Sequence, residues 1–401
     1  MPEAAGLSLE EKIRDRVLKR LAGKGFDVGK EIDPDLFAHT FGCLDKAVSK
    51  GFGKVEYGTP DYDFLEGLRH NNAVFAAFKT HRQQNEIHAR LFDEDGKRKD
   101  FDRFRKDTAG ILQDYNVNWL RTEYDTAVRR ARFAADFRSC RANKDLYPNL
   151  EWLPSVSATP REAHRVFYGQ IRPLEDPFWD TNYPGNLWNC KCGIRSTDKP
   201  VNATGDAAPV QAAPGLDKNP ATSGEVFTES HPYIKGASIE AKKAVEEFVY
   251  KEYTDIPVRN GKLRIHEKHG KNERKENIKV GTYLAEKHGY EIDLIENPDG
   301  EKSADSFNRT LGCFQEYKVN GKATVNAIDM AIKSGSKQAN DLVLWIDSDI
   351  RLEDLAAAIR PRVIRTGRIT HITIVRNGKD KRYSREDIIA EGFKIRQADL
   401  E

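Results

Sequence analysis

Cysteine, long apolar runs and an excess of charge of one sign are all scarce in this 401-residue sequence. Its five cysteines are few for the length and odd in number, which argues against a disulfide framework. No apolar run approaches the ~18 residues of a membrane span, and residues 1–20 read as an amphipathic helix without the apolar core of a signal peptide. The formal net charge is only +2, so any nucleic-acid-binding surface has to be local. We expect a soluble protein from a reducing cytoplasm, with no membrane partner.

Two regions of different character are separated by a segment that has almost no large apolar residues. Residues 1–198 begin with long helical patterns, interrupted near Asn116, and end in a loop-rich, β-prone part. Residues 199–224 are rich in Pro, Ala, Gly, Asn and Thr, which predicts a flexible linker. Residues 225–401 alternate helices and strands, which predicts a mixed sheet covered by helices. The expected fold class is therefore α+β and multidomain.

A run at residues 176–195, DPFWDTNYPGNLWNCKCGIR, is dense in aromatic residues, prolines and cysteines. Cys190 and Cys192 flank one lysine, so on a strand they would face the same side. One interpretation is half of a structural Zn²⁺ site, with His164 as a possible third ligand. The other is two small buried residues on a core strand. We prefer the second interpretation, because no further Cys or His pair follows at zinc spacing.

The same run resembles the end of the head-morphogenesis domain of Mu-type phage minor head proteins. The upstream segments TPREAHRVFYGQIRPLED and NVNWLRTEYDTAVRRARFAADF extend the resemblance over roughly residues 60–198. Gly185 stands where that family usually has a second proline. The resemblance implies a virion protein of the head, near the portal, made in the host cytoplasm. It implies portal and capsid proteins as partners and a role in head assembly or DNA delivery, without catalysis.

A second run, ADSFNRTLGCFQEYKV at residues 304–319, has the pattern of a hairpin around NRTLG. The hairpin would return Asp305 to lie near Glu316, and Lys318 would share the strand face of Glu316. Two carboxylates suit Mg²⁺ or Mn²⁺, and a neighbouring lysine can serve the attacking water in phosphodiester hydrolysis. The alternative is a solvated hairpin with a cross-strand pair of charges. The end of the chain adds basic residues that could bind phosphate: Arg360, Arg362, Arg365, Arg368, Arg376, Lys379, Lys381, Arg382 and Arg385.

Residues 260–376 resemble, in outline, the PD-(D/E)xK nuclease superfamily and the tRNA-cleaving C-terminal domains of contact-dependent inhibition toxins. The order is a helical glutamate, an aspartate and then Glu-x-Lys, although alanine stands before the aspartate where the family has proline. The resemblance implies that the substrate is RNA, such as tRNA, or DNA, and it admits an immunity protein as a partner. The residues that it implies for the site are Asp305 and Glu316 as metal ligands, Lys318 for the water, Glu276 (with Glu273 as the other candidate) in support, and Gln338 as an auxiliary.

Two alternatives to this enzyme stay open at the level of sequence. His266 and His269 could act as acid and base in a metal-independent, barnase-like ribonuclease, although we prefer them as solvent-exposed residues of a polar loop. The second domain could also lack catalysis and only bind nucleic acid or a capsid partner. The sequence thus predicts a phage minor head protein that carries a C-terminal, metal-dependent nuclease domain.

Overall fold

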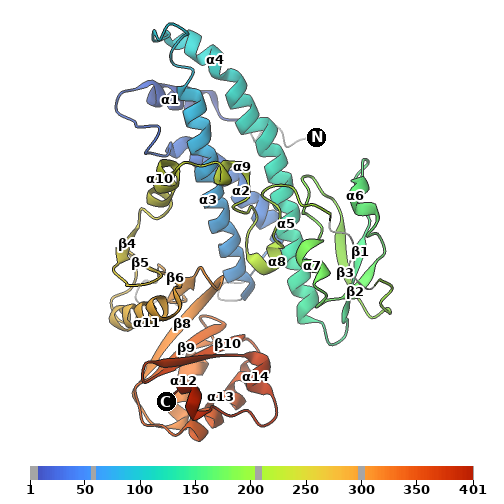
Figure 1. Cartoon of the computed structure of the whole chain (residues 1–401), viewed down its shortest axis with the longest axis vertical. Helices are drawn as coiled ribbons and strands as arrows, with labels where there is room; N and C mark the ends of the chain where they lie inside the picture. Colours follow the sequence, from blue (N-terminus) through green and yellow to red (C-terminus); the bar gives the residue numbers. More distant parts are fainter. Residues whose placement is uncertain (1–7, 56–59, 204–209, 297–302, 401) are drawn as a thin grey trace. The chain divides into compact units, whose positions relative to one another are not determined.

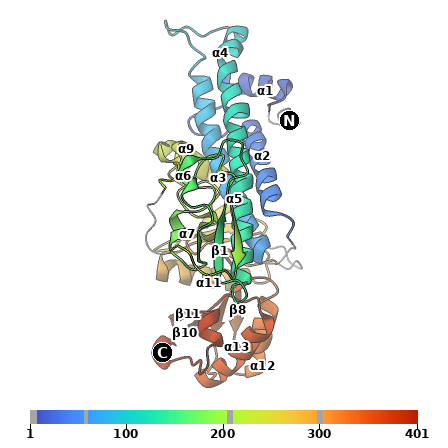
Figure 2. The same cartoon turned by 90° about the vertical axis from the view of Figure 1, so that its right-hand side faces the viewer.

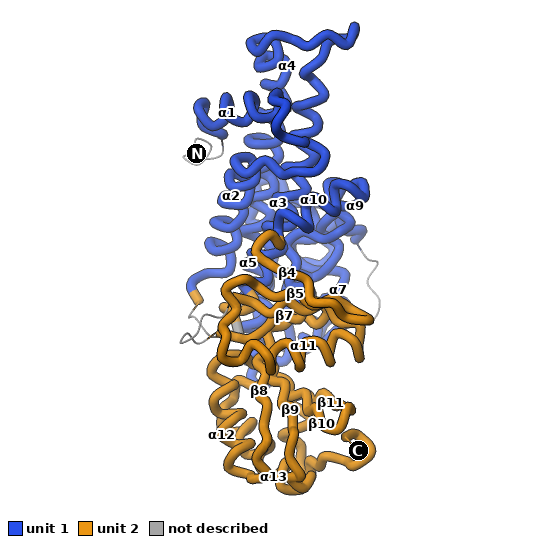
Figure 3. The backbone as a smooth tube through the Cα atoms, turned by 90° about the vertical axis from the view of Figure 1, so that its left-hand side faces the viewer, with its two compact units in different colours: residues 1–54, 65–249 blue, residues 55–64, 250–401 orange. Residues whose placement is uncertain are grey.

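The computed structural model describes residues 8–55, 60–203, 210–296 and 303–400. The chain forms two compact units, coloured separately in Figure 3: Met1–Lys54 with Leu65–Val249, and Val55–Phe64 with Tyr250–Glu401. The first is mainly helical and the second is built on a mixed sheet, which confirms the predicted α+β, multidomain fold. Among the described residues, no helix has both the length and the apolar character needed to cross a membrane.

Long helices form the body of the first unit. They are α1 (Glu11–Ala22), α2 (Pro34–Phe52), α3 (Pro60–His88), α4 (Phe101–Gln113) and α5 (Trp119–Ala142). The predicted interruption near Asn116 is a π-helical turn, η2 (Asp114–Asn118), that joins α4 to α5 without breaking the helix. The continuous helix α4–η2–α5 lies beside α3 in both views (Figures 1 and 2). A buried ion pair between Lys79 of α3 and Glu123 of α5 links the two.

A small antiparallel sheet follows α5 in the first unit. Its strands β1 (Asn149–Leu153), β2 (Ile171–Pro173) and β3 (Gly193–Thr197) have the order β2-β1-β3. The short helices α6 (Glu162–Arg165) and α7 (Phe178–Thr181) lie between the strands in sequence. Four buried aromatic rings pack together here and supply the apolar area that a loop-rich region needs: Trp152, Phe167, Phe178 and Trp179.

The prediction of a flexible linker over residues 199–224 is wrong for residues 210–224. Residues 210–224 pack into the first unit, and Leu216 is fully buried. The guanidinium of Arg130 donates to the carbonyl oxygens of Leu216 and Lys218, at 3.4 and 2.7 Å. The unit continues through α8 (Pro220–Ser223), α9 (Pro232–Lys235) and α10 (Ile239–Val249). The boundary therefore falls after Val249 and not at the predicted linker, of which residues 204–209 lie outside the described residues.

Burial of His231 makes the stability of the first unit depend on pH. The ring packs against Phe75 and Tyr233, and burial, with the charges of Lys79 and Arg82, lowers its pKa to about 4. The unfolded chain takes up this proton near pH 6.5, whereas the folded unit resists it down to about pH 4. Acidification through that window should therefore reduce the free energy of unfolding by on the order of 3 kcal/mol.

Urea unfolding of the wild type and of His231→Gln, followed across the same pH window, checks this prediction. In the wild type, the Tyr233 N–H donates to His231 Nδ1 at 3.2 Å. Glutamine keeps an acceptor for this N–H, but its side chain cannot titrate. We expect the variant to lose markedly less stability on acidification than the wild type. An equal acid-induced loss in the two proteins would contradict the assignment.

The second unit is organised around one eight-stranded mixed sheet, ordered β11-β10-β9-β8-β7-β6-β5-β4. Pairs β5–β6, β8–β9 and β9–β10 are parallel, and the remaining pairs are antiparallel. The strands are β4 (Tyr253–Ile256), β5 (Lys262–His266), β6 (Glu291–Leu294), β7 (Ser306–Asn308), β8 (Cys313–Asn320), β9 (Asp341–Ile346), β10 (His371–Arg376) and β11 (Lys379–Ser384).

Helices cover both faces of this sheet. Side chains of β9 alternate between the faces, since Leu342 and Leu344 join the apolar cluster of α12 and α13 whereas Val343 joins that of α11. The helices are α11 (Arg274–His288), α12 (Val325–Gly335), α13 (Leu352–Thr366), α14 (Arg385–Ile389) and α15 (Gln397–Leu400). Helix α11 ends at a left-handed glycine, Gly289, with φ of 70°. The predicted mixed sheet with helical cover is confirmed.

Candidate functional site

A hairpin of β7 and β8 brings the two predicted metal-binding carboxylates together. The strands pair antiparallel, with Ser306 opposite Gln315. Asp305 directly precedes β7, and its N–H donates to the Gln315 carbonyl oxygen at 3.2 Å. Continuing the same register places Asp305 opposite Glu316, as the sequence predicts.

Three carboxylates converge at this end of the hairpin. One oxygen each from Glu273, Asp305 and Glu316 lie within 4.8 Å of one another. Asp305 and Glu316 are fully buried, whereas the Glu273 side chain is 57% exposed. Two buried acidic groups with a third at the solvent boundary form the oxygen-rich cluster that a hard divalent cation such as Mg²⁺ prefers.

Lys318 and Gln338 hold the Glu316 carboxylate from one side. The Lys318 ammonium lies 2.6 Å from Glu316 Oε1 and 3.6 Å from the Glu273 carboxylate. The Gln338 amide N–H donates to the same Oε1. The other oxygen, Oε2, is buried without a hydrogen-bond partner in the described part of the chain. A buried oxygen left without a donor is destabilising, and a bound cation would satisfy it.

Asp305 is oriented by donors from two other elements. Its Oδ2 accepts from the Tyr317 N–H at 2.8 Å, and its Oδ1 accepts from the Asn277 amide of α11, also at 2.8 Å. Asn277 Nδ2 lies 3.1 Å from His269 Nε2, and His269 Nδ1 donates to the Ile295 carbonyl oxygen at 2.6 Å. Both ring nitrogens of His269 are thus engaged, and its contact to the site runs through Asn277.

The preferred interpretation of His266 and His269 as exposed loop residues is wrong. Their side chains are buried, with 5% and 4% of their surface exposed. His266 closes β5 and lies 3.2 Å from Glu252. His269 supports the carboxylate cluster through Asn277, a residue that the sequence analysis did not single out. An asparagine in the first turn of a helix gives no signal in sequence that distinguishes it from a solvent-exposed residue.

The acidic group predicted on α11 is replaced by its neighbour. The structure gathers Asp305, Glu316, Lys318 and Gln338 as expected, but the third carboxylate is Glu273, at the N-cap of α11. Glu276, in the first turn, is exposed and is not in this group. The sequence has two glutamates near the start of this helix. The residue at which the helix begins determines that Glu273, and not Glu276, reaches Lys318.

Burial and mutual repulsion shift the titration of this cluster. Burial raises the pKa of Glu316 well above its ordinary value, and the Asp305 charge adds to the effect. Burial also raises the pKa of Asp305, against the hydrogen bond from the Tyr317 N–H. Burial acts to lower the pKa of Lys318, but the Glu316 carboxylate outweighs it and raises that pKa. Lys318 is therefore an ammonium at neutral pH, and the raised carboxyl pKa values mean that a bound cation would compete with protons for Asp305 and Glu316.

Stability of the second unit should fall with rising pH unless a divalent cation is present. A raised carboxyl pKa stabilises the fold fully below the ordinary value near ~4, and that stabilisation is lost as the pH rises through the folded value. Because Mg²⁺ competes with these protons, its stabilising effect should grow from about pH 5 to about pH 8. Thermal unfolding with Mg²⁺ or with chelator measures both trends, and Glu316→Gln should weaken both. A Mg²⁺ effect that is equal at the two pH values would contradict the prediction.

Many basic residues near the C-terminus are engaged inside the second unit. Arg362 and Arg365 bind the Asp329 carboxylate, and Arg382 binds Asp341. Their charge is therefore partly neutralised by these partners, and the predicted phosphate-binding surface is weaker than the sequence count indicates.

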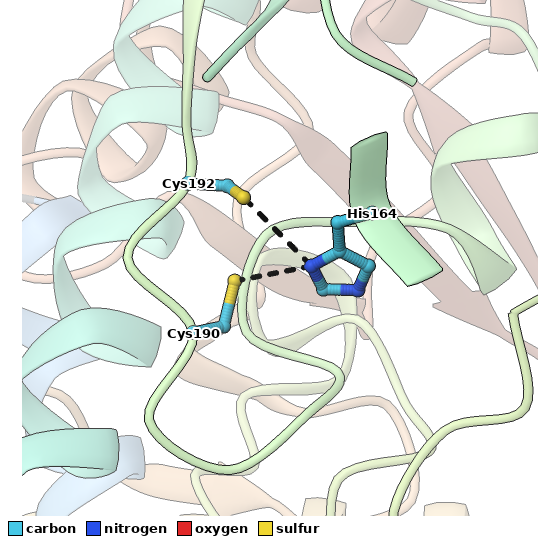
Figure 4. A group of neighbouring side chains, drawn as sticks. All are labelled: His164, Cys190 and Cys192. Atoms are coloured by element: carbon cyan, nitrogen blue, oxygen red, sulfur yellow. Dashed lines mark hydrogen bonds between the residues drawn. The ribbon is translucent and has the colours of Figure 1, made fainter. Parts of the chain in front are cut away.

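A second cluster with metal-ligand chemistry lies in the first unit (Figure 4). The sequence analysis expected Cys190 and Cys192 on a strand, and this is wrong: both lie in the loop before β3. Their sulfurs lie 3.4 and 3.8 Å from His164 Nδ1. Hydrogen bonding to Cys192 lowers the pKa of the Cys190 thiol to about 4, and His164 acts in the same direction, against burial. The same thiol pairing raises the pKa of Cys192.

Comparison with known proteins finds that residues 81–195, within the first unit, are similar to phage and prophage proteins. Residues 81–195 match the family model described as Phage Mu protein F like protein. The chain is 31% identical over 77 residues to the "Putative capsid assembly protein F" of Escherichia phage Mu, covering 19% of this chain and 18% of that protein. It is 28% identical over 109 residues to the Mu-like prophage FluMu F protein of Haemophilus influenzae, covering 25% of each. Residues 81–195 are therefore a Mu F-like segment, which confirms that resemblance for this part of the chain.

This chain spans about a quarter or less of the length of both relatives. Among solved structures, it is similar to a CdiA-CT/CdiI toxin and immunity complex from Burkholderia pseudomallei. That similarity covers 27% of this chain and 83% of the other, at 19% identity and a TM-score of 0.23, which carries no argument about fold or activity.

Proposed function

We propose that the second unit is a divalent-metal-dependent nuclease and that the Mu F-like segment attaches it to a phage head. The observation that supports the nuclease is the convergence of Glu273, Asp305 and Glu316 beside the Lys318 ammonium. The Oε2 of Glu316, which is buried and has no hydrogen-bond partner among the described residues, gives a cation a specific place to bind. A solvated hairpin, the alternative from sequence, would not bury two carboxylates side by side without such a role.

The residues of the site fit Mg²⁺ or Mn²⁺ by their chemistry. Asp305 and Glu316 would hold the ion and Glu273 would complete its protein ligands, with water and substrate phosphate in the remaining positions. The bound ion supplies Lewis-acid activation of the phosphodiester and of a water. Gln338 keeps Glu316 in place, and Asn277 does the same for Asp305.

Lys318 has a defined task in this arrangement. Its ammonium lies 2.6 Å from Glu316 and is partly exposed, with 16% of its side chain accessible. It can therefore donate to the attacking water or to a phosphate oxygen next to the ion, and stabilise negative charge that develops there. Because its pKa is raised, Lys318 begins the reaction as a positioning cation and not as a base.

The nuclease proposal is tested with the purified full chain on three substrates: tRNA, total RNA and duplex DNA. Each is incubated with Mg²⁺, with Mn²⁺ or with a chelator. Cleavage that requires the metal supports the proposal and identifies the substrate class. Cleavage that is unchanged in chelator would favour the metal-independent ribonuclease, and a folded chain that cuts none of the substrates would contradict the proposal.

The head-assembly role of the first unit has its own support. The Mu F-like segment is similar to proteins whose names describe capsid assembly or a Mu-like prophage. We propose that portal and capsid proteins are its partners, that the virion head is its location, and that an immunity protein restrains the nuclease in the producing cell. Mass spectrometry of purified particles should find the chain at a few copies per head. Its absence from intact particles would contradict this role.

A further inference from the structure

Three side chains of the kind that bind zinc lie together in the first unit, and neither proposed activity uses them. They are His164 of α6 and the two cysteines of the loop before β3, Cys190 and Cys192. One donor atom from each lies within 4.8 Å of the others. His164 has no exposed surface, Cys190 has 3%, and Cys192 is half-buried. Figure 4 shows both sulfurs directed at the same ring nitrogen, Nδ1.

The hydrogen bonding of His164 leaves that nitrogen available. Its Nε2–H donates to Asn186 Oδ1 at 2.8 Å, and Asn186 is itself fully buried. The amide orientation of Asn186 is fixed in turn, because its Nδ2 donates to the Thr181 carbonyl oxygen at 3.3 Å. With the proton on Nε2, the Nδ1 lone pair points at the two sulfurs. Metal-binding histidines are typically oriented in this way, by a partner on the ring nitrogen that does not bind the metal.

We propose that Cys190, Cys192 and His164 bind one zinc ion, with water in the fourth position. Thiolate and imidazole donors select zinc over Mg²⁺ or Ca²⁺, and three protein ligands leave one tetrahedral position open beside the half-buried Cys192. The ion ties α6 to a loop 26 residues further along the chain. It therefore closes the region of the Mu F-like segment that has the least regular secondary structure.

The surroundings of the site suit a bound thiolate–zinc group. The Trp152 ring packs edge-on against His164, with centroids 5.5 Å apart, and Phe167 packs against Trp152. Two merely small buried cysteines would not require a histidine whose Nδ1 faces both of their sulfurs. The geometry thus favours the metal over the interpretation preferred from sequence.

Elemental analysis of the full chain, purified without added metal or chelator, tests the proposal. We expect close to one zinc per chain in the wild type and a loss of most of it in Cys190→Ser and in His164→Ala. Cys140→Ser is the matched control, because Cys140 is, like Cys190, a buried free thiol of the same unit; this variant should keep its zinc. Equal zinc content in all four proteins, or none in the wild type, would overturn the proposal.

Two further measurements keep the test decisive if a variant fails to fold. The wild type loaded with Co²⁺ should show thiolate-to-cobalt charge-transfer absorption, and absence of this band would contradict cysteine ligation. Asn186→Ala leaves all three ligands in place but frees the His164 ring, so zinc affinity in a chelator competition should fall roughly 10–100-fold. An unchanged affinity would contradict the proposed orienting role of Asn186.

Discussion

Replacing Lys318 with alanine should reduce metal-dependent cleavage by roughly 10²–10⁴-fold, the usual contribution of a positioned proton donor or acceptor. The ammonium is 2.6 Å from Glu316 and 3.6 Å from Glu273, so it lies where the attacking water and a phosphate oxygen would meet the ion. Its removal should leave the metal ligands in place. Initial cleavage rates with Mg²⁺ measure the effect, and Mn²⁺ titration of the same variant should show binding within a few-fold of the wild type.

Lys322→Ala is the matched control, since Lys322 is an exposed lysine shortly after the same strand. It should cleave at the wild-type rate. If the second unit only bound nucleic acid, the wild type would not cleave it. Lys318→Ala and Lys322→Ala would then each lower its affinity for nucleic acid slightly. Wild-type cleavage in Lys318→Ala would remove this residue from the site and contradict the proposed chemistry.

Replacing Arg130 with alanine should destabilise the first unit by about 3–5 kcal/mol. The guanidinium is fully buried and donates to a set of backbone carbonyl oxygens, those of Gly185, Leu216, Lys218 and Glu225. Alanine leaves several of these acceptors buried without a donor, and each such loss is worth about 1–3 kcal/mol before relaxation. The free energy of unfolding from urea denaturation measures the change.

Arg132→Ala on the same helix controls for the loss of an arginine, because Arg132 is exposed. It should change the free energy of unfolding by less than about 0.5 kcal/mol. A loss below about 1 kcal/mol in Arg130→Ala would show that water or neighbouring donors satisfy these carbonyls, and that Arg130 does not hold residues 210–224 in place.

The hairpin of the candidate site could be predicted from local sequence. A turn flanked by strand-like runs fixes the register, and the register places Asp305 opposite Glu316. The choice of Glu273 over Glu276 could not be predicted, because it depends on where α11 begins to within one turn. Asn277 was missed and His269 was assigned to an exposed loop for a similar reason: both reach Asp305 only through the packing of α11.

The segment at residues 210–224 shows the limit of arguments from composition. Its residues cannot build a core of their own, which is why the sequence predicts a linker. Arg130 supplies the missing interactions from a helix earlier in the chain, by donating hydrogen bonds to backbone carbonyl oxygens 86 and 88 residues further on. Backbone carbonyls are present in every sequence, so such a contact leaves no signal in residue type. The cluster of His164 with Cys190 and Cys192, by contrast, could be anticipated from residue type, and the structure brings the three side chains together.

Anomalous diffraction from a crystal of the full chain grown with Mn²⁺ tests the central claim most directly. The proposed nuclease site predicts an anomalous peak between the carboxylates of Asp305 and Glu316, with Glu273 close enough to ligate, and no such peak in Asp305→Asn. A wild-type map with ordered carboxylates and no peak between them, at Mn²⁺ concentrations that support cleavage by other nucleases, would contradict the metal site and the function proposed from it.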